Sequence, residues 1–179
     1  MTAEFTPSSP ATDDEPVASR RDFVAAAAVT VAAAAGAVAP AQAQVPNVRH
    51  TNPQGMSTPA AYSQVVEVNG PHRVVYLAGQ TGQDASGKIA QGIHDQAVQV
   101  MENIKTALAS VGGGFEHVVK LNTYMLDIDA HGPAYREVRT SYFSNKAALP
   151  ASTLLQVSRL ANPMYLLEVE ALAILPPRA

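Results

Sequence analysis

The chain has 179 residues, with 12 basic and 15 acidic side chains and no cysteine. This length allows one ordinary domain with an appendage, and a chain without cysteine forms neither a disulfide nor a cysteine-based metal site. Beyond residue 43 the basic residues are scattered singly apart from Arg136 and Arg139. Because a surface that tracks phosphates needs a basic stripe, we expect no nucleic-acid partner.

The first 43 residues have the composition of an export signal. Residues 1–18 are polar and acidic, and the pair Arg20-Arg21 then precedes an alanine-rich run that ends in an A-x-A pattern at Ala43. Together these features are typical of a twin-arginine (Tat) signal. An ordinary alanine-rich helix or a membrane anchor is the alternative, but a span needs about 20 consistently apolar residues. We predict cleavage after Ala43 and a periplasmic or secreted bacterial protein that has no membrane contact after cleavage.

The remaining chain is predicted to hold an extended leader, 44–57, and one domain, 58–176. Alternating apolar residues, turn signals and one strong helical period predict the order strand, strand, helix, strand, helix, strand, strand. Two helices among mixed strands indicate an α+β domain with a single sheet and both helices on one face. The predicted bounds are 64–68, 73–78, 94–111, 118–126, 133–145, 151–160 and 163–175.

Local signals support several of these bounds. Asn69-Gly70 is a strong hairpin turn signal between the first two strands, and the glycines of 112–114 suit the end of the first helix. Pro133 is placed early in the second helix, where proline is tolerated. Asp127 and Asp129 are predicted to cap the segment that follows them.

Two carboxylates lie two residues apart in the last predicted strand. Glu168 and Glu170 are surrounded by apolar residues, and the two-residue period of a strand puts both on one face. They lie either on a solvated face or in a reactive site, because a carboxylate can position and deprotonate water. The residues alone leave both interpretations open.

The C-terminal stretch closely resembles the signature of the RidA (YjgF) family. The matching residues are Pro150-Ala151, Val157, Arg159-Leu160 and the run 168–174. The resemblance covers roughly residues 58–176 and implies a chorismate-mutase-like α+β fold. It also implies assembly as a homotrimer, with active sites in the clefts between subunits, and hydrolysis of small imines or enamines.

The resemblance assigns roles to individual residues. Glu170 matches the glutamate that positions water, whereas Ser152 stands where active members carry an arginine that binds the substrate carboxylate. A serine hydroxyl cannot replace a bidentate ion pair, so 2-aminoacrylate is expected to be handled poorly or not at all. Gly79 matches a backbone position that lines the site, with a simple turn glycine as the alternative. Tyr62 matches a tyrosine of the family's Tyr-Ser-Gln sequence and is a candidate to close over the cleft, with a packed aromatic as the alternative.

Arg136 falls near a position where many members carry an active-site asparagine. It is a candidate substitute for the missing arginine, and Arg139 lies one turn further along; the alternative is two solvated helix arginines. The five histidines are dispersed without an i,i+4 pair, so we expect no metal and no other cofactor.

The leading hypothesis is a RidA-like hydrolase that acts on small reactive imines or enamines. A non-catalytic trimeric module that binds a small ligand or a protein partner in the same cleft is the alternative. Nuclease activity is disfavoured, because the chain without residues 1–43 carries ten basic and ten acidic groups and has no net charge.

Overall fold

The computed structural model describes residues 45–178. The predicted export signal, residues 1–43, therefore lies outside the described residues. No helix within the described part is long and apolar enough to cross a membrane.

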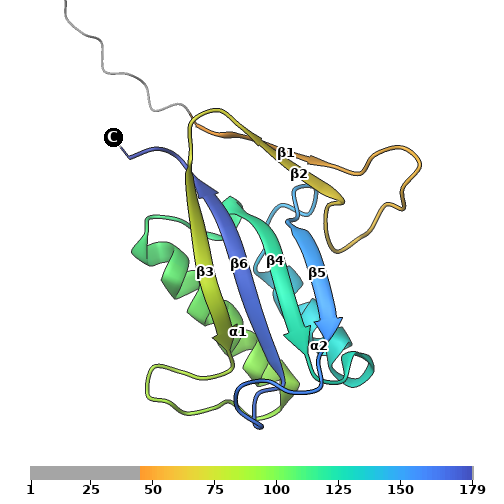
Figure 1. Cartoon of the computed structure of the whole chain (residues 1–179), viewed down its shortest axis with the longest axis vertical. Coiled ribbons are helices and arrows are strands. Elements are labelled where there is room, and N and C mark those ends of the chain that lie inside the picture. Colours follow the sequence, from red (N-terminus) through yellow and green to blue (C-terminus); the bar gives the residue numbers. More distant parts are fainter. Residues whose placement is uncertain (1–44, 179) are drawn as a thin grey trace, which may run out of the picture. The chain divides into compact units, whose positions relative to one another are not determined.

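A four-stranded mixed sheet forms the centre of the domain, in the order β3-β6-β4-β5 (Figure 1). Strand β6 (Leu167–Leu175) pairs antiparallel with β3 (Arg73–Thr81) on one side and with β4 (Val118–Met125) on the other. Strand β5 (Ala151–Gln156) runs parallel to β4 at the edge. The last strand of the chain is therefore an inner strand, with backbone partners on both sides.

Helices α1 (Gly92–Ser110) and α2 (Ile128–Ser141) lie against one face of this sheet, behind it in Figure 1. Alternate residues of β6 face the helices and are buried, as the two-residue period of a strand requires. They are Leu167, Val169, Ala171, Ala173 and Leu175. The apolar stripe of α1 supplies the other side of the core, with Ala97, Val100, Met101, Ile104 and Leu108. The predicted α+β class, with both helices on one face, is confirmed.

A separate two-stranded sheet corrects the prediction of a single sheet. Strand β1 (Asn47–Thr51) pairs antiparallel with β2 (Val65–Asn69), and neither belongs to the four-stranded sheet. The leader thus contributes a strand that was not predicted, and β2 pairs with β1 instead of forming the expected hairpin with β3. The turn chemistry of Asn69-Gly70 reverses the chain, but it does not decide which strand becomes the partner.

Helix α2 begins five residues earlier than predicted. Asp127 is its N-cap: it has a left-handed backbone, φ 47°, and its Oδ1 accepts a hydrogen bond of 3.0 Å from the backbone N–H of Ala130. The predicted capping role of Asp127 is confirmed, and the start at Pro133 is wrong. The capped first turn sets the start of the helix, so Pro133 lies inside it.

The two terminal strands are shorter than predicted. Strand β5 ends at Gln156 and β6 begins at Leu167. Between them Asn162 accepts backbone hydrogen bonds from Met164 at its side chain, 2.9 Å, and from Tyr165 at its carbonyl, 3.1 Å. The Asn-Pro turn thus continues as a longer irregular segment, because the asparagine side chain offers the backbone a partner outside the sheet.

Two glycines lie in contrasting surroundings, which predicts opposite effects on stability. A Cβ on Gly82 would lie 2.9 Å from Cα of Gln96 in α1, whereas a Cβ on Gly132 would meet Ile128 at 3.6 Å, an ordinary contact. We expect Gly82→Ala to lower the free energy of unfolding by about 1–3 kcal/mol. Gly132→Ala, inside α2, should raise it by about 0.5–1 kcal/mol. Urea unfolding measures both, and a stabilising Gly82→Ala would contradict the packing described here.

Candidate functional site

The face of the four-stranded sheet turned away from α1 and α2, here called the open face, carries the polar side chains of its central strands. Strand β4 alternates between buried residues and half-buried Lys120, Asn122 and Tyr124. Strand β6 alternates in the same way and places Glu168 and Glu170 beside them. Both carboxylates are half-buried, so the sheet face holds them close to other side chains and does not leave them fully in water.

Glu170 is held by two donors from the neighbouring strand. The side-chain amide of Asn122, its register partner, donates to Oε2 at 3.3 Å, and the hydroxyl of Tyr124 donates to the same oxygen at 3.2 Å. No donor within residues 45–178 bonds to Oε1 of Glu170. A carboxylate oxygen has two acceptor positions, so the oriented carboxylate presents one oxygen that can accept a hydrogen bond from water.

Tyr124 remains a neutral donor in this arrangement. The negative charge of Glu170 raises the pKa of the Tyr124 hydroxyl above its usual value, and partial desolvation, the hydrogen bond to Glu170 and the charge of Glu168 act in the same direction. A nearby like charge disfavours the phenolate. At neutral pH, Tyr124 is therefore available as the hydrogen-bond donor that orients Glu170.

Gly79 provides the space for the second carboxylate. The pairing of β3 with β6 shifts register between Leu77 and Gln80, and Gly79 lies in this irregularity. A Cβ on Gly79 would lie 1.8 Å from Oε1 of Glu168. Gly79 is thus not a turn glycine: it lies within a strand, where the missing side chain admits the Glu168 carboxylate of the same chain.

Ser152 lies on the other side of the sheet from Glu170. It pairs with Leu121, which is fully buried beneath the helices, whereas the next residue, Thr153, pairs with Asn122 on the open face. Because paired residues of neighbouring strands share a face, Ser152 and Glu170 are not brought together within one chain. The position next to the Asn122–Glu170 pair belongs to Thr153.

Tyr62 is half-buried in a segment that is bound to the start of β5. The next residue, Ser63, donates its backbone N–H to the carbonyl of Pro150 at 3.2 Å and its hydroxyl to the carbonyl of Leu149 at 2.6 Å. These bonds place Tyr62 near residue 150, the first of the Pro-Ala pair. They do not place it near Glu170.

The two helix arginines differ in their surroundings. Arg136 is exposed on α2, on the far side of the sheet from Glu170. Arg139 is only 4% exposed, donates a hydrogen bond from Nη2 to the carbonyl of Ala61, and its Nε has no partner among the described residues. Burial lowers the pKa of Arg139. It therefore holds the segment before Tyr62, and within one chain neither arginine reaches the carboxylates.

The sequence did not single out Asn122 and Tyr124, the two side chains that bind Glu170. The period-two alternation of polar and apolar residues through β4 was visible in the sequence and placed both on one face with Lys120. The sequence did not indicate that both residues contact Glu170, because the register between β4 and β6 joins residues 46 and 48 positions apart.

The described residues form no metal site, and the two grooves named here lie away from Glu168 and Glu170. No cluster of three or more His, Cys, Asp or Glu side chains in residues 45–178 could hold a metal ion. A groove of about 320 Å³ lies between the two helices and includes His94 and Glu137. Another, of about 700 Å³, lies beside α1 and includes Gln83 and Asn103. Their linings contain neither Glu168 nor Glu170.

Gly79→Ala is expected to displace the Glu168 carboxylate without unfolding the domain. The atoms that a Cβ would meet belong to the Glu168 side chain, which can rotate away. We expect a retained cooperative unfolding transition and a moved Glu168 side chain in a crystal structure of the variant. An unmoved Glu168 would contradict the close approach described here.

Comparisons with known proteins agree with this fold. The family model described as Endoribonuclease L-PSP matches residues 52–175. The 2-iminobutanoate/2-iminopropanoate deaminase of Rattus norvegicus is 34% identical over 119 residues, which cover 65% of this chain and 82% of that protein. A RutC family protein of Aquifex aeolicus is 32% identical over 100 residues, covering 55% and 77%.

Solved structures similar to this chain include members of the Rid family. The conserved Rid-family protein YyfB of Yersinia pestis, a protein of unknown function, is 32% identical with a TM-score of 0.65, covering 72% of this chain and 99% of that one. RidA of the Antarctic bacterium Psychrobacter is 31% identical with a TM-score of 0.53, covering 65% and 90%. The chain belongs to the Endoribonuclease L-PSP family, the family of the RidA (YjgF) proteins.

Proposed function

We propose that this protein hydrolyses small reactive imines or enamines and releases ammonia and a carbonyl compound. The observation that carries the proposal is the Glu170 carboxylate, with one oxygen bound by Asn122 and Tyr124 and the other without a donor from residues 45–178. Relatives about 34% identical to this chain are named 2-iminobutanoate/2-iminopropanoate deaminase, which supports the same chemistry.

Imine hydrolysis needs a water that attacks the C=N carbon and a proton for the nitrogen. In the proposed mechanism, Oε1 of Glu170 accepts a hydrogen bond from the water and takes its proton as the new C–O bond forms. Glu170 then returns that proton to the nitrogen. As the carbinolamine collapses, Glu170 takes the hydroxyl proton and passes it to the nitrogen, the C=O bond forms and the C–N bond breaks, so imine and water become a carbonyl compound and ammonia. An enamine enters after protonation at carbon.

The surroundings of Glu170 suit this role. Asn122 and Tyr124 hold Oε2 in place, so the carboxylate is already in the orientation that the reaction needs. The raised pKa of Tyr124 keeps its hydroxyl protonated, so it continues to donate while Glu170 gains and loses a proton. The residue at position 152 bears on the choice of substrate: without an arginine there, we expect 2-aminoacrylate to be a poor substrate.

A non-catalytic module that binds a small ligand is the second candidate. The observation that favours it is Ser152, which supplies no charge for a substrate carboxylate and pairs with buried Leu121. Such a protein would bind imine-derived ligands on the open face without turnover.

We also propose that the protein is a homotrimer in which neighbouring subunits cover part of the open face. Tyr76 and Val74 on β3 are 79% and 46% exposed, and Leu155 on β5 is 51% exposed, which leaves large apolar side chains at both edges of this face for a partner. Light scattering on the purified protein should give three times the mass of one chain, and a monomer would contradict the proposal.

Removal of the Glu170 charge tests the deaminase proposal. The full chain is supplied with imino acids made in situ by an amino-acid oxidase, and the loss of imine is followed by trapping with semicarbazide. We expect Glu170→Gln to slow the loss of imine about 100-fold or more, because the amide cannot accept the proton of water. Glu137→Gln, at an exposed position of α2, is the matched control and should keep full activity.

Full activity of Glu170→Gln would rule out the proposed base. If the unmodified protein consumes no imine but is stabilised against heat by the corresponding keto acids, the second candidate replaces the first.

A further inference from the structure

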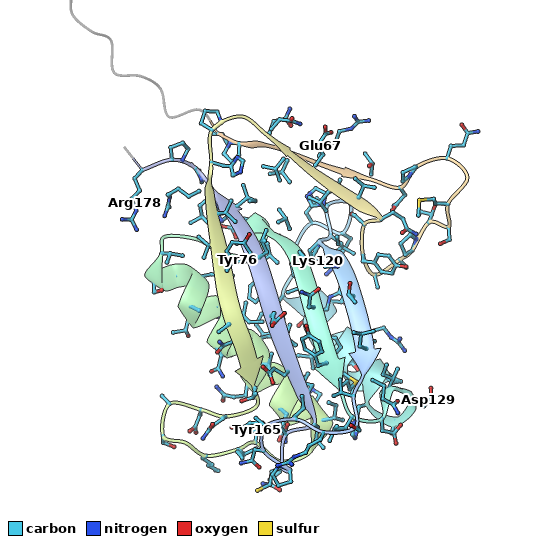
Figure 2. The ribbon with its side chains drawn as sticks, viewed as in Figure 1. Glu67, Tyr76, Lys120, Asp129, Tyr165 and Arg178 are labelled. Atoms are coloured by element: carbon cyan, nitrogen blue, oxygen red, sulfur yellow. The ribbon has the colours of Figure 1, made fainter. Side chains whose placement is uncertain are left out.

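Lys120 is the cationic side chain of the open face. On the described strands, the residues that share this face are aliphatic, aromatic, hydroxyl, amide or carboxylate side chains apart from Lys120. The nearby arginine of β3, Arg73, donates to the carbonyls of Pro176 and Val111 at 2.9 and 3.3 Å and is engaged there. Figure 2 shows Lys120 and Tyr76 over the central part of the sheet, on the side away from the helices.

The ammonium of Lys120 has unused hydrogen-bonding capacity. It donates to the hydroxyl of Thr153 at 2.6 Å, and no carboxylate within residues 45–178 forms an ion pair with it. An ammonium group has three donors, so two remain available. A cation without an anionic partner attracts an anion.

Thr153 adds a second donor at the same place. Its hydroxyl oxygen accepts from Lys120, which leaves its hydrogen free to donate. Of the other polar groups nearby, Asn122 and Tyr124 both donate to Glu170, and the exposed Tyr76 lies in the same row as Lys120. Lys120 therefore supplies the charged donors beside Glu170, and Thr153 supplies a neutral donor next to them.

The strand register places this pair beside Glu170. Tyr76, Leu172 and Lys120 form one row across β3, β6 and β4. Asn122, Glu170 and Thr153 form the next row across β4, β6 and β5. Lys120 is thus a diagonal neighbour of Glu170, a relation that separates backbones by about 7–8 Å.

The same register puts Glu168 one row further away. Charge therefore changes along the open face, from two carboxylates at one end to an ammonium at the other. An anionic substrate is favoured in one orientation, with its negative group at Lys120 and its reacting carbon at Glu170. In the reverse orientation its negative group would face Glu168.

We propose that Lys120 and Thr153 form the subsite that binds the carboxylate of an anionic imine, in place of the arginine that is absent at Ser152. This inference rests on the proposed deaminase function and names its substrate class as imino acids. An ammonium is a point charge without the fork of an arginine, so the subsite accepts anions of differing shape but orients them less strictly. Because Lys120 orients the carboxylate less strictly than an arginine would, we still expect 2-aminoacrylate to be a poor substrate.

The test compares two imines that differ in the carboxylate. An amino-acid oxidase makes 2-iminobutanoate from 2-aminobutanoate, and an amine oxidase makes the carboxylate-free imine of propylamine; trapping with semicarbazide measures the loss of each. The full chain carries Lys120→Met, Lys120→Arg or Thr153→Val. Lys105→Met is the control, because Lys105 is exposed on α1, where it pairs with Glu102 at 3.4 Å.

We expect Lys120→Met to raise KM for 2-iminobutanoate about 10- to 100-fold, the range for a hydrogen bond to a charged group, and to leave kcat nearly unchanged. The carboxylate-free imine should be consumed as by the unmodified protein. Lys120→Arg should restore most of the affinity. Thr153→Val should raise KM by a smaller factor, and it tests the subsite even if Lys120→Met does not fold. Equal effects on both imines, or no effect on either, would overturn the subsite.

A binding titration separates failure of the subsite from failure of the proposed function. The probe is 2-oxobutanoate, the keto acid product, followed by calorimetry. If no imine is consumed but Lys120→Met abolishes keto acid binding, the deaminase proposal fails and the subsite stands. If imine loss depends on Glu170 while Lys120→Met changes neither KM nor keto acid binding, the subsite fails and the deaminase proposal stands.

Discussion

The pairing of β6 with both β3 and β4 is the constraint on which the rest of the structure depends. An inner strand must satisfy its backbone on both sides and bury alternate side chains against the helices. In β6 those buried residues are Leu167 through Leu175 at every second position. The same alternation leaves Glu168 and Glu170 no place except the open face, next to the side chains of β4. The core therefore sets the position of the carboxylates, and a register shift of one residue would bury both.

The neighbours of β6 then determine what the carboxylates can do. On one side Asn122 and Tyr124 fix one oxygen of Glu170, and on the other Gly79 leaves room for Glu168. Lys120 lies in the next row of paired residues, and two of its three ammonium N–H groups have no partner among the described residues. A fixed carboxylate beside an open cation suits a small polar substrate with an anionic end better than a long polymer, and the few basic groups of the chain agree with that preference.

Local sequence patterns predicted the helices and strands with strong periodicity. They did not predict which strands pair when the strands are far apart in the chain. The apolar alternation of β6 and the helical period of α1 were both visible, because they arise from burial of a single face. The left-handed N-cap at Asp127 outweighed the proline signal that had suggested a later start for α2. Strand β1 was missed because it pairs with β2 across an intervening irregular segment, which no local pattern in the sequence indicates. Ser152 could be aligned with a family position, but only its pairing with Leu121 reveals which face it occupies.

A crystal structure of the full chain soaked with 2-oxobutanoate would test most directly whether the open face of β4 and β6 is the binding site. We predict density for the keto acid over these two strands, with its carboxylate at Lys120 and Thr153 and its carbonyl carbon facing Oε1 of Glu170. Density instead in the groove between α1 and α2, or a carboxylate bound at Arg136, would contradict it.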